Sequence, residues 1–323
     1  MRERLSRLHL LRRIDGRSGM KVLVTGARGK VGRATVAALL EAGHEVRASD
    51  LAPPTFERER PGDPQEYFQA DMTDAGDAFA VVRGVDAVVH AAAIPEPTKN
   101  PPYVVFHNNL MGVFNALEAA VRWGVPRFVN VSSETVPGFF FPERPFLPDY
   151  LPVDEEHPIR PQDPYATAKH FGEQLMDAGV RRSDVRAISI RPCWVQHEGN
   201  YERNLGPQVR DAGVLSPNFW SYIDVYDLAD ALVLAVESDL PGHEVFYIAS
   251  PDNVGNRPLK ETVRKYYPDA DIELRELERE DASGISCKKA RDLLGYSPKR
   301  TWSDYLDAEG RLKPGVKGLF SGD

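Results

Sequence analysis

Val22-Leu23-Val24-Thr25-Gly26-Ala27-Arg28-Gly29-Lys30-Val31-Gly32 is the stretch of sequence that decides the fold. An apolar run rich in β-branched residues ends in three glycines with the spacing G-x-x-G-x-x-G, and a pattern of Ala, Val and Leu follows from Val31 to Leu40. This order predicts a strand, a tight turn and a helix. The N-terminus of such a helix exposes unpaired N–H groups and the positive end of its dipole, so the turn is expected to attract phosphate.

The three glycines have separate tasks in a dinucleotide-binding turn. Gly26 and Gly29 let the chain turn and let a pyrophosphate approach the backbone, and Gly32 lets the helix pack close to the strand. A glycine repeat also occurs in ordinary strand-to-helix turns, so its meaning depends on the residues that come after it in the chain. The positions of the turn that we expect to contact a cofactor are Gly26, Arg28, Gly29, Lys30, Val31 and Gly32.

A second strand-like run over residues 44–49 ends in Asp50, 18 residues after Gly32. Dinucleotide-binding folds place here an acid that hydrogen-bonds the ribose hydroxyls of adenosine. Asp50 would repel a 2′-phosphate, so the predicted cofactor is NAD. Arg28 and Arg33 are expected near the same pocket and favour such a phosphate, so an NADP-dependent reductase is an alternative.

Composition excludes several classes of function. The 323 residues are 42% apolar with a formal net charge of −8, which is enough for a large core. The mild acidity, without a basic patch interleaved with aromatic residues, predicts no nucleic-acid partner. No apolar run reaches about 18 residues, which predicts no membrane association by a spanning helix. Cys193 and Cys287 lie far apart without a CxxC pair, which indicates a reducing, cytoplasmic compartment and no bound metal.

Residues 1–19 form an arginine-rich N-terminal extension. Six arginines crowd a short segment that contains leucines but lacks the continuous apolar core of a secretory signal. We expect an extension that frays or packs on the surface. An amphipathic helix for a membrane or a partner is the alternative.

Strand and helix patterns alternate through most of the remaining chain. This alternation predicts an α/β fold with a doubly wound parallel sheet of the Rossmann type, in which ligands bind outside the carboxyl ends of the strands. Further strands are predicted at 66–70, 85–90, 126–131, 185–191 and 244–249, and helices at 103–123, 164–178 and 224–236.

The same pattern predicts the domain organisation. A dinucleotide-binding domain spans residues 20–191, and residues 223–250 return to it. The segments 192–222 and 251–323 are expected to form a small C-terminal substrate-binding region that covers the site. The first of these segments carries few periodic signals. The second carries helical patterns at 258–267 and 286–294, with a strand between them near 271–277.

The candidate chemistry lies in Tyr165 and Lys169, four residues apart on one face of a predicted helix. A phenol with an ordinary pKa near 10 is a poor base at neutral pH. A neighbouring ammonium and an oxidised nicotinamide stabilise the phenolate, so the pair can take a proton from a carbinol as hydride leaves its carbon. Ser133, at the end of a predicted strand, is the candidate for orienting the substrate oxygen. In an arbitrary protein, Tyr-x-x-x-Lys is more often an exposed helix pair.

From Lys21 to about Gly295 the chain resembles the extended short-chain dehydrogenase/reductases, the group of NAD-dependent sugar epimerases and dehydratases. The motifs are specific for fold and cofactor but poorly specific for substrate. They are Thr25–Gly32, Asp50, Asp71, His90-Ala91-Ala92-Ala93, Asn109-Leu110-Met111-Gly112, Val131–Gly138, Tyr165–Lys169, Arg191-Pro192 and Ile223–Ala231.

The resemblance implies roles for further residues. Tyr165 would be the base, Ser133 would orient the substrate hydroxyl, and Lys169 would tune the base and bind the nicotinamide ribose. The helices at 103–123 and 164–178 resemble those that pair between subunits in this family, which implies a homodimer. The other implied cofactor contacts are Asp71 and Met72 beside adenine, Ala91 and Ala93 along the cofactor channel, Asn109 as a buttress, and Pro192 and Cys193 near the carboxamide.

Departures from the family pattern bear on the substrate. Dehydratases carry an Asp-Glu pair just after their serine or threonine, where this chain has Glu134 and Thr135, so dehydration is in doubt. Only 33 residues separate Pro192 from Tyr226, and enzymes for nucleotide-linked sugars usually spend many more there. The candidate substrate residues are Glu134, His197, Arg203 and Arg210.

The predicted function is therefore that of an NAD-dependent oxidoreductase or epimerase acting by hydride transfer at a secondary hydroxyl of a sugar or sugar-acid-like substrate. The short segment favours a dehydrogenase on a small substrate. A nucleotide-sugar 4-epimerase that keeps NAD bound is the main alternative. A non-catalytic dinucleotide sensor is disfavoured, because such proteins usually lose the tyrosine or lysine.

Overall fold

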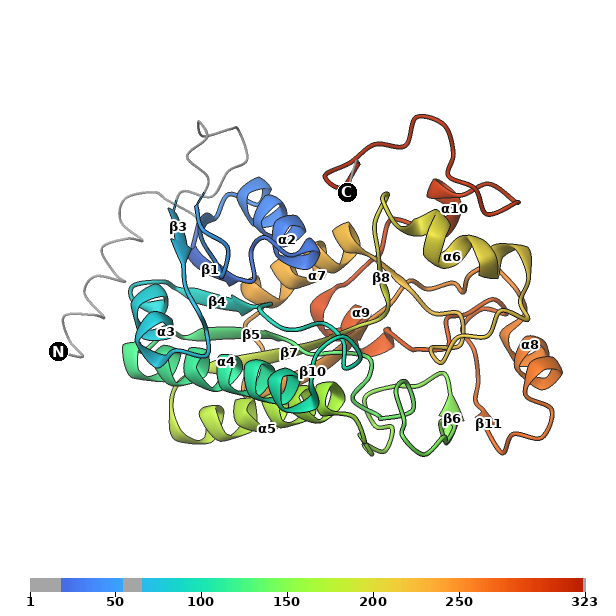
Figure 1. The fold of residues 1–323 in the computed structure, drawn as a ribbon, viewed down its shortest axis with the longest axis horizontal. Coiled ribbons are helices and arrows are strands. Elements are labelled where there is room, and N and C mark those ends of the chain that lie inside the picture. Colours follow the sequence, from blue (N-terminus) through green and yellow to red (C-terminus); the bar gives the residue numbers. More distant parts are fainter. Residues whose placement is uncertain (1–18, 55–65, 322–323) are drawn as a thin grey trace.

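The computed structural model describes residues 19–54 and 66–321, and its centre is a seven-stranded parallel sheet (Figure 1). The order of the strands across the sheet is β10-β7-β5-β4-β1-β2-β3, so the chain winds outward from β1 in both directions. The predicted doubly wound, Rossmann-type α/β fold is confirmed. The strands are β1 (Lys21–Thr25), β2 (Glu45–Asp50), β3 (Glu66–Gln69), β4 (Ala87–His90), β5 (Arg127–Val131), β7 (Arg186–Pro192) and β10 (His243–Ile248).

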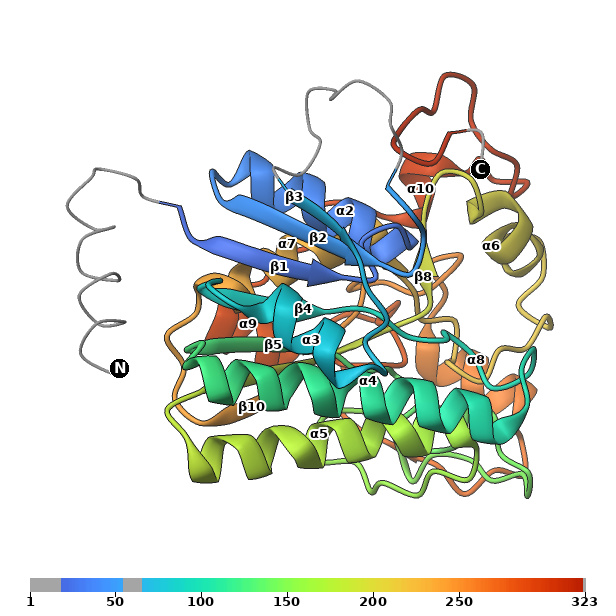
Figure 2. The same cartoon turned by 60° about the vertical axis from the view of Figure 1, so that its left-hand side comes forward.

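Helices cover both faces of the sheet (Figures 1 and 2). The side chains of β1 alternate between the two layers: Val22 and Val24 are buried toward α2 and α7, and Leu23 toward α3, α4 and α5. Among the described residues no helix is both long and apolar enough to cross a membrane. One layer holds α2 (Lys30–Glu41) and α7 (Val225–Glu237), and the other holds α3 (Ala75–Val82), α4 (Pro102–Trp123) and α5 (Pro164–Arg182).

Shorter elements lie beyond the carboxyl ends of the strands, on the right of Figure 1. Two small parallel ribbons join β6 (Tyr150–Leu151) to β11 (Glu273–Leu274), and β8 (Val195–Gln196) to β9 (Ile223–Asp224). The remaining helices are α6 (Tyr201–Arg210), α8 (Leu259–Tyr266), α9 (Lys288–Leu294), which packs on β10 and α7, and α10 (Trp302–Tyr305).

The predicted strands of the main sheet begin and end within two residues of those observed, and β10 returns to the sheet beside β7 as expected. Among the described helices, three are not predicted: α3 and α10 are only eight and four residues long, and α6 contains Pro207, which disrupts a helical pattern. The strand expected near 271–277 is reduced to β11, which pairs with β6 and not with the main sheet. The arginine-rich extension lies, apart from Gly19, outside the described residues.

Two glycines of the first turn are required by packing. Gly26 has a φ of +65°, and a Cβ there would lie 2.7 Å from the backbone of Ala92. A Cβ at Gly32 would lie 2.1 Å from the carbonyl oxygen of Gly26. The absence of both side chains lets α2 start directly against the end of β1, as expected for Gly32 from the sequence.

A buried ion pair fixes α5 to the sheet. Arg191 of β7 donates from Nε and Nη2 to the two carboxylate oxygens of Glu173, both at 2.8 Å, and the side chains are 3% and 4% exposed. Ser132, just after β5, donates its hydroxyl to Glu173 Oε1 at 2.6 Å. The helix is thereby locked to the ends of two neighbouring strands.

Candidate functional site

The N-terminus of α2 is open to an anion. Its N-cap residue, Gly29, has no side chain to cap the helix, and the first turn holds no acidic residue. By contrast, α3, α5 and α7 begin with the capping carboxylates of Asp74, Asp163 and Asp224. The free N–H groups of α2 therefore suit a phosphate.

In the part of the chain that the structure describes, no side chain crowds the residue before this helix. A Cβ added to Gly29 would meet, within 4 Å, only the carbonyl oxygen of Gly26, at 3.2 Å. Arg28 lies in the turn, and Lys30 and Val31 are the first two residues of α2. The uncapped start of α2 and the lack of a side chain at Gly29 fit the pyrophosphate of a dinucleotide.

Asp50 lies at the end of β2, beside the glycine turn. Its carboxylate accepts hydrogen bonds from the backbone N–H of Arg28 at 2.9 Å and of Ala52 at 3.3 Å. The Arg28 guanidinium lies over the ring of Tyr67, 4.9 Å from its centroid. The structure thus brings the acid and the turn together.

Asp71 and Met72 follow β3. The Asp71 carboxylate accepts from the N–H and the hydroxyl of Thr73, at 2.8 and 2.7 Å. Met72 is buried, and its carbonyl oxygen accepts from Asn115 of α4 at 3.0 Å. This segment is therefore held firmly, next to the edge of the sheet where β2 ends.

Asn109 of α4 supports the loop after β4. Its side-chain oxygen accepts from the N–H of Ile94 at 2.8 Å, and its side-chain nitrogen donates to the Ile94 carbonyl oxygen at 3.0 Å. The Ala92 N–H donates to the hydroxyl of Thr25 at 3.2 Å. Ala91 and Ala93 are thereby fixed next to the glycine turn, and the contacts of Asn109 suit the buttress that the sequence implies.

Ser133, Tyr165 and Lys169 come together where β5 ends and α5 begins. The Ser133 hydroxyl is near enough to the Tyr165 phenol to lower its pKa, and it accepts from the hydroxyl of Thr135 at 3.0 Å. Lys169 Nζ lies 5.7 Å from the centroid of the Tyr165 ring and donates to the carbonyl oxygen of Val131 at 2.7 Å. An ammonium has three donors, and Val131 takes one of them.

Burial governs the ionisation of this group. It raises the pKa of Tyr165 to about 12, although the hydrogen bond with Ser133 lowers it. Burial also lowers the pKa of Lys169 to about 8, and the charge of Glu173 acts in the opposite direction. A positive charge added beside Tyr165 would lower the pKa of its phenol again.

Glu134, Pro192 and Cys193 meet where β5 and β7 end. The N–H of Glu134 donates to the carbonyl oxygen of Pro192 at 3.1 Å. The side chains of Glu134 and Cys193 are buried, and each affects the pKa of the other. Burial raises the pKa of Glu134 to about 8, although hydrogen bonds from the Cys193 thiol and the Trp194 N–H lower it.

The other predicted substrate residues lie elsewhere. Arg203 lines a cavity of about 520 Å³ between the start of α6 and residues 312–321, and its Nε donates to Asn204 at 3.3 Å. Arg210 donates to the carbonyl oxygen of Glu309 at 3.1 Å. The hydrogen bonds of these arginines are thus with Asn204 and Glu309, not with Ser133, Tyr165 or Lys169.

His197 is buried over the phosphate-binding turn. Its Nε2 lies 2.5 Å from Nζ of Lys30, at the start of α2, and its Nδ1 lies 3.1 Å from the N–H of Gly199. Its ring lies against the ring of Phe320, with 4.8 Å between centroids and a tilt of 47° between the planes. The histidine therefore joins the cofactor turn to the C-terminal part of the chain.

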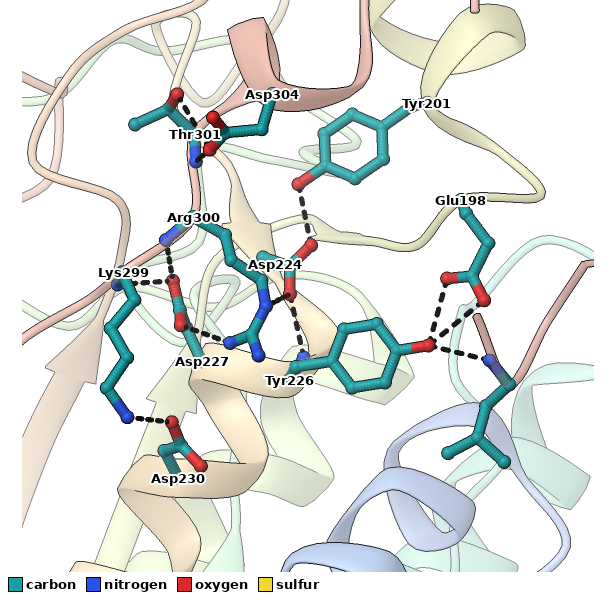
Figure 3. A network of polar contacts seen from close by, with 11 residues as sticks. Glu198, Tyr201, Asp224, Tyr226, Asp227, Asp230, Lys299, Arg300, Thr301 and Asp304 are labelled. Carbon is teal, nitrogen blue, oxygen red and sulfur yellow. Dashed lines mark hydrogen bonds and ion pairs between the residues drawn. The ribbon is translucent and has the colours of Figure 1, made fainter. Parts of the chain in front are cut away.

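The C-terminal strap, which we define as residues 316–321, is a feature that the sequence analysis misses. Buried Glu198 accepts from the Tyr226 hydroxyl at 3.0 Å (Figure 3). Glu198 also accepts from the Phe320 N–H at 2.7 Å, and the Leu319 N–H donates to the Tyr226 hydroxyl at 2.8 Å. Arg33 of α2 donates to the Leu319 carbonyl oxygen at 2.8 Å. No local sequence signal marks Glu198, because its partners lie up to 122 residues away.

A second network of hydrogen bonds joins Lys299 and Arg300 to α7. Asp227 is 1% exposed and accepts from Arg300 Nη1 at 2.8 Å and from the N–H groups of Lys299 and Arg300, at 2.9 and 2.8 Å (Figure 3). The sequence shows Asp227 within a motif but not its partner. Within residues 19–54 and 66–321, no cluster of three or more His, Cys, Asp or Glu side chains is arranged to hold a metal ion.

A family model described as the NAD dependent epimerase/dehydratase family matches residues 22–249. The chain belongs to this family. Members of the NAD dependent epimerase/dehydratase family are enzymes that use NAD, and NAD is the cofactor of this chain. The resemblance to the extended short-chain dehydrogenase/reductases is thereby confirmed.

Relatives within the family differ in activity. A UDP-glucose 4-epimerase of Corynebacterium glutamicum is 26% identical over 311 residues, covering 87% of this chain and 92% of the relative. A uronate dehydrogenase of Pseudomonas syringae pv. tomato is 31% identical over 173 residues, covering 53% of this chain and 58% of the relative. A solved UDP-galactose 4-epimerase aligns with a TM-score of 0.63 at 28% identity, covering 90% of this chain and 96% of that one.

Asp50→Ala tests the choice of cofactor. Wild-type protein is expected to bind NAD more tightly than NADP, and the variant should reduce that difference by about 1–3 kcal/mol, because one charge-assisted ribose contact is lost. Dissociation constants for both dinucleotides, measured by calorimetry, check this. Glu41→Ala, which removes an exposed acid from the far end of α2, is the control. Tighter binding of NADP than NAD by the wild type would contradict the assignment of Asp50.

Proposed function

We propose that the protein is an NAD-dependent oxidoreductase or epimerase that transfers hydride at a secondary hydroxyl of a sugar or sugar acid. Of the two activities, we favour a dehydrogenase acting on a small substrate without a nucleotide. The observation that carries the proposal is the convergence of Ser133, Tyr165 and Lys169 at the carboxyl end of β5, beside the glycine turn that fits a dinucleotide. In this fold, ligands bind at that end of the sheet.

The chain's own residues supply the proton chemistry. Ser133 holds the substrate hydroxyl, and Tyr165 takes its proton as the carbon–hydrogen bond breaks. Lys169 stabilises the phenolate and offers its remaining donors to a ribose hydroxyl. NAD, when bound, supplies the hydride acceptor. An epimerase would use the same residues in reverse to return the proton on the second half of its cycle.

The size of the segment between Pro192 and Tyr226 supports a small substrate. It comprises 33 residues, 193–225, and contains one ten-residue helix, α6. Arg203 and Arg210, its two arginines at positions suited to a phosphate, contact Asn204 and Glu309 instead of forming a joint anion site. A nucleotide needs dedicated surface and cationic partners. We propose that 192–222 and the part of the chain after 250 form the substrate-binding region.

A nucleotide-sugar 4-epimerase is the second candidate. The relatives that match this chain over most of its length include UDP-glucose 4-epimerases, whereas the uronate dehydrogenase matches over about half of it. The two candidates differ in whether NADH leaves the enzyme, and in whether free UDP binds.

Tyr165→Phe tests the proposed chemistry. The variant keeps the ring but removes the proton acceptor, so turnover should fall by about 10²–10⁴ while NAD binding stays close to that of the wild type. Steady-state NADH formation and calorimetric NAD titration measure the two effects. Tyr266→Phe, on α8 away from the site, is the matched control. Full activity of Tyr165→Phe would refute the proposed role.

Titration with free UDP and dTDP tests the substrate class. NAD-loaded protein should give no calorimetric binding with a Kd of about 10 µM or tighter, because the segment 193–225 leaves little room for a nucleotide pocket. A panel of free sugars, uronic acids and polyols should contain a substrate that produces NADH. Micromolar binding of either nucleotide, in competition with substrate, would instead establish the epimerase.

We also propose that the protein is a cytoplasmic homodimer. Its two cysteines are free and buried, as in proteins of reducing compartments. Tyr103 and Phe114 of α4 and Phe171 of α5 are 75%, 38% and 44% exposed, although they are large and apolar. These two helices lie side by side (Figure 2). Such exposed apolar side chains suit a helical interface between two copies.

Phe171→Glu is expected to shift the protein from dimer to monomer, because a charge would be buried in the proposed interface. Light scattering after size exclusion measures the mass. Leu293→Glu on α9, which replaces a side chain of similar exposure (49%), should leave the dimer intact. A wild-type mass of a single chain would show that the proposed interface is not used.

A further inference from the structure

The carboxyl group of Glu134 is buried beside the reactive hydroxyls. A glutamate directly after a strand is expected to face water, but this side chain is only 7% exposed. Its oxygen Oε2 has no hydrogen-bond partner among the described residues. The peptide N–H of Glu134 is bonded to Pro192, so the loop after β5 has little freedom to turn the carboxyl outward.

Among the described residues, the groups that act on the pKa of this carboxyl include no cation. From the end of β7 come the Cys193 thiol and the Trp194 N–H, both of which lower its pKa. The Tyr165 phenol faces the carboxyl from α5. A negative charge on Glu134 or on Asp163 raises the pKa of this phenol. The nearby ammonium of Lys169 is directed at the carbonyl oxygen of Val131. A buried carboxylate without a cationic partner is strongly disfavoured, so the neutral acid predominates.

The charge of this group matters for the proposed chemistry. Tyr165 has to carry a negative charge when it accepts the substrate's proton. A second negative charge on Glu134 would oppose that ionisation, whereas a neutral carboxylic acid would not. Because burial raises the pKa of Glu134 to about 8, its proton is lost only in mildly alkaline solution.

We propose that Glu134 is a positioning residue for proton transfer at Tyr165, which takes part in turnover as a neutral acid and stops the reaction when it ionises. This proposal rests on the proposed role of Tyr165 as the base. Ionisation of Glu134 releases its proton to solvent and requires no further reactant. The Cys193 thiol adjusts the response, because its hydrogen bond favours the charged form of Glu134.

The pH profile of kcat tests the proposal. In the wild type, kcat should decline above about pH 8 by up to about a hundredfold per pH unit, because Glu134 and Lys169 both lose their protons near that pH. Glu134→Gln is neutral at every pH, so only the loss of the Lys169 proton should remain and the decline should become shallower, at most about tenfold per pH unit. Cys193→Ala removes a hydrogen bond that lowers the pKa of Glu134, so the decline should move to higher pH. An alkaline decline in Glu134→Gln that matches the wild type would overturn the proposal.

A second measurement separates this proposal from the proposed function. Infrared difference spectra of wild type minus Glu134→Gln should show, at pH 7, the carbonyl stretch of a protonated carboxylic acid, and this band should titrate away near pH 8. The measurement needs neither substrate nor turnover. If the band is present but no sugar is oxidised, the proposed function fails while the neutral state of Glu134 stands. If the band is absent at pH 7, the proposal about Glu134 is wrong whatever the enzyme's substrate.

Discussion

The buried ion pair between Arg191 and Glu173 is the interaction on which the site depends. It uses two hydrogen bonds of 2.8 Å in a nearly water-free setting, and Ser132 adds a third to the same carboxylate. Removing one partner of such a pair typically costs about 3–5 kcal/mol, because the other charge is left buried and unpaired. The pair therefore fixes where α5 sits on the sheet. The same helix carries Tyr165 and Lys169, so the positions of these two side chains depend on this contact.

Much of the fold could be predicted from the sequence because its signals are local. The strands of the main sheet are short apolar runs between turns, and α4 and α5 carry long helical patterns. Where the sequence pattern did not predict an element correctly, a competing effect is the reason. Pro207 disrupts the pattern of α6, although the helix is held by burial of Tyr201 and Leu205. The segment 271–277 looks like a strand, but only Glu273 and Leu274 find a partner.

The site could be predicted only in part, for a similar reason. Tyr165 and Lys169 are recognisable because four residues separate them on one helix, and the glycine turn because its spacing is contiguous. The burial of Glu134 has no local signature: it depends on Cys193 and Trp194, which arrive from another strand. Glu198 accepts a hydrogen bond from the N–H of Phe320, and Phe320 lies outside the part of the chain that resembles the family. Arg203 and Arg210 have the right charge for an anion, but the C-terminal segment takes up their contacts.

The spacing of Tyr165, Lys169 and Glu173 also constrains the length of the chain. Each residue of an α-helix turns the side-chain direction by about 100°, so residues four apart return to nearly the same face. Inserting or deleting a single residue between Tyr165 and Glu173 would keep the ion pair only by rotating the tyrosine away from Ser133. The exposed loop residues 143–145 have no such requirement, because they lie outside α5. Along α5, substitutions on the outer face are therefore compatible with the site, whereas changes in length are not.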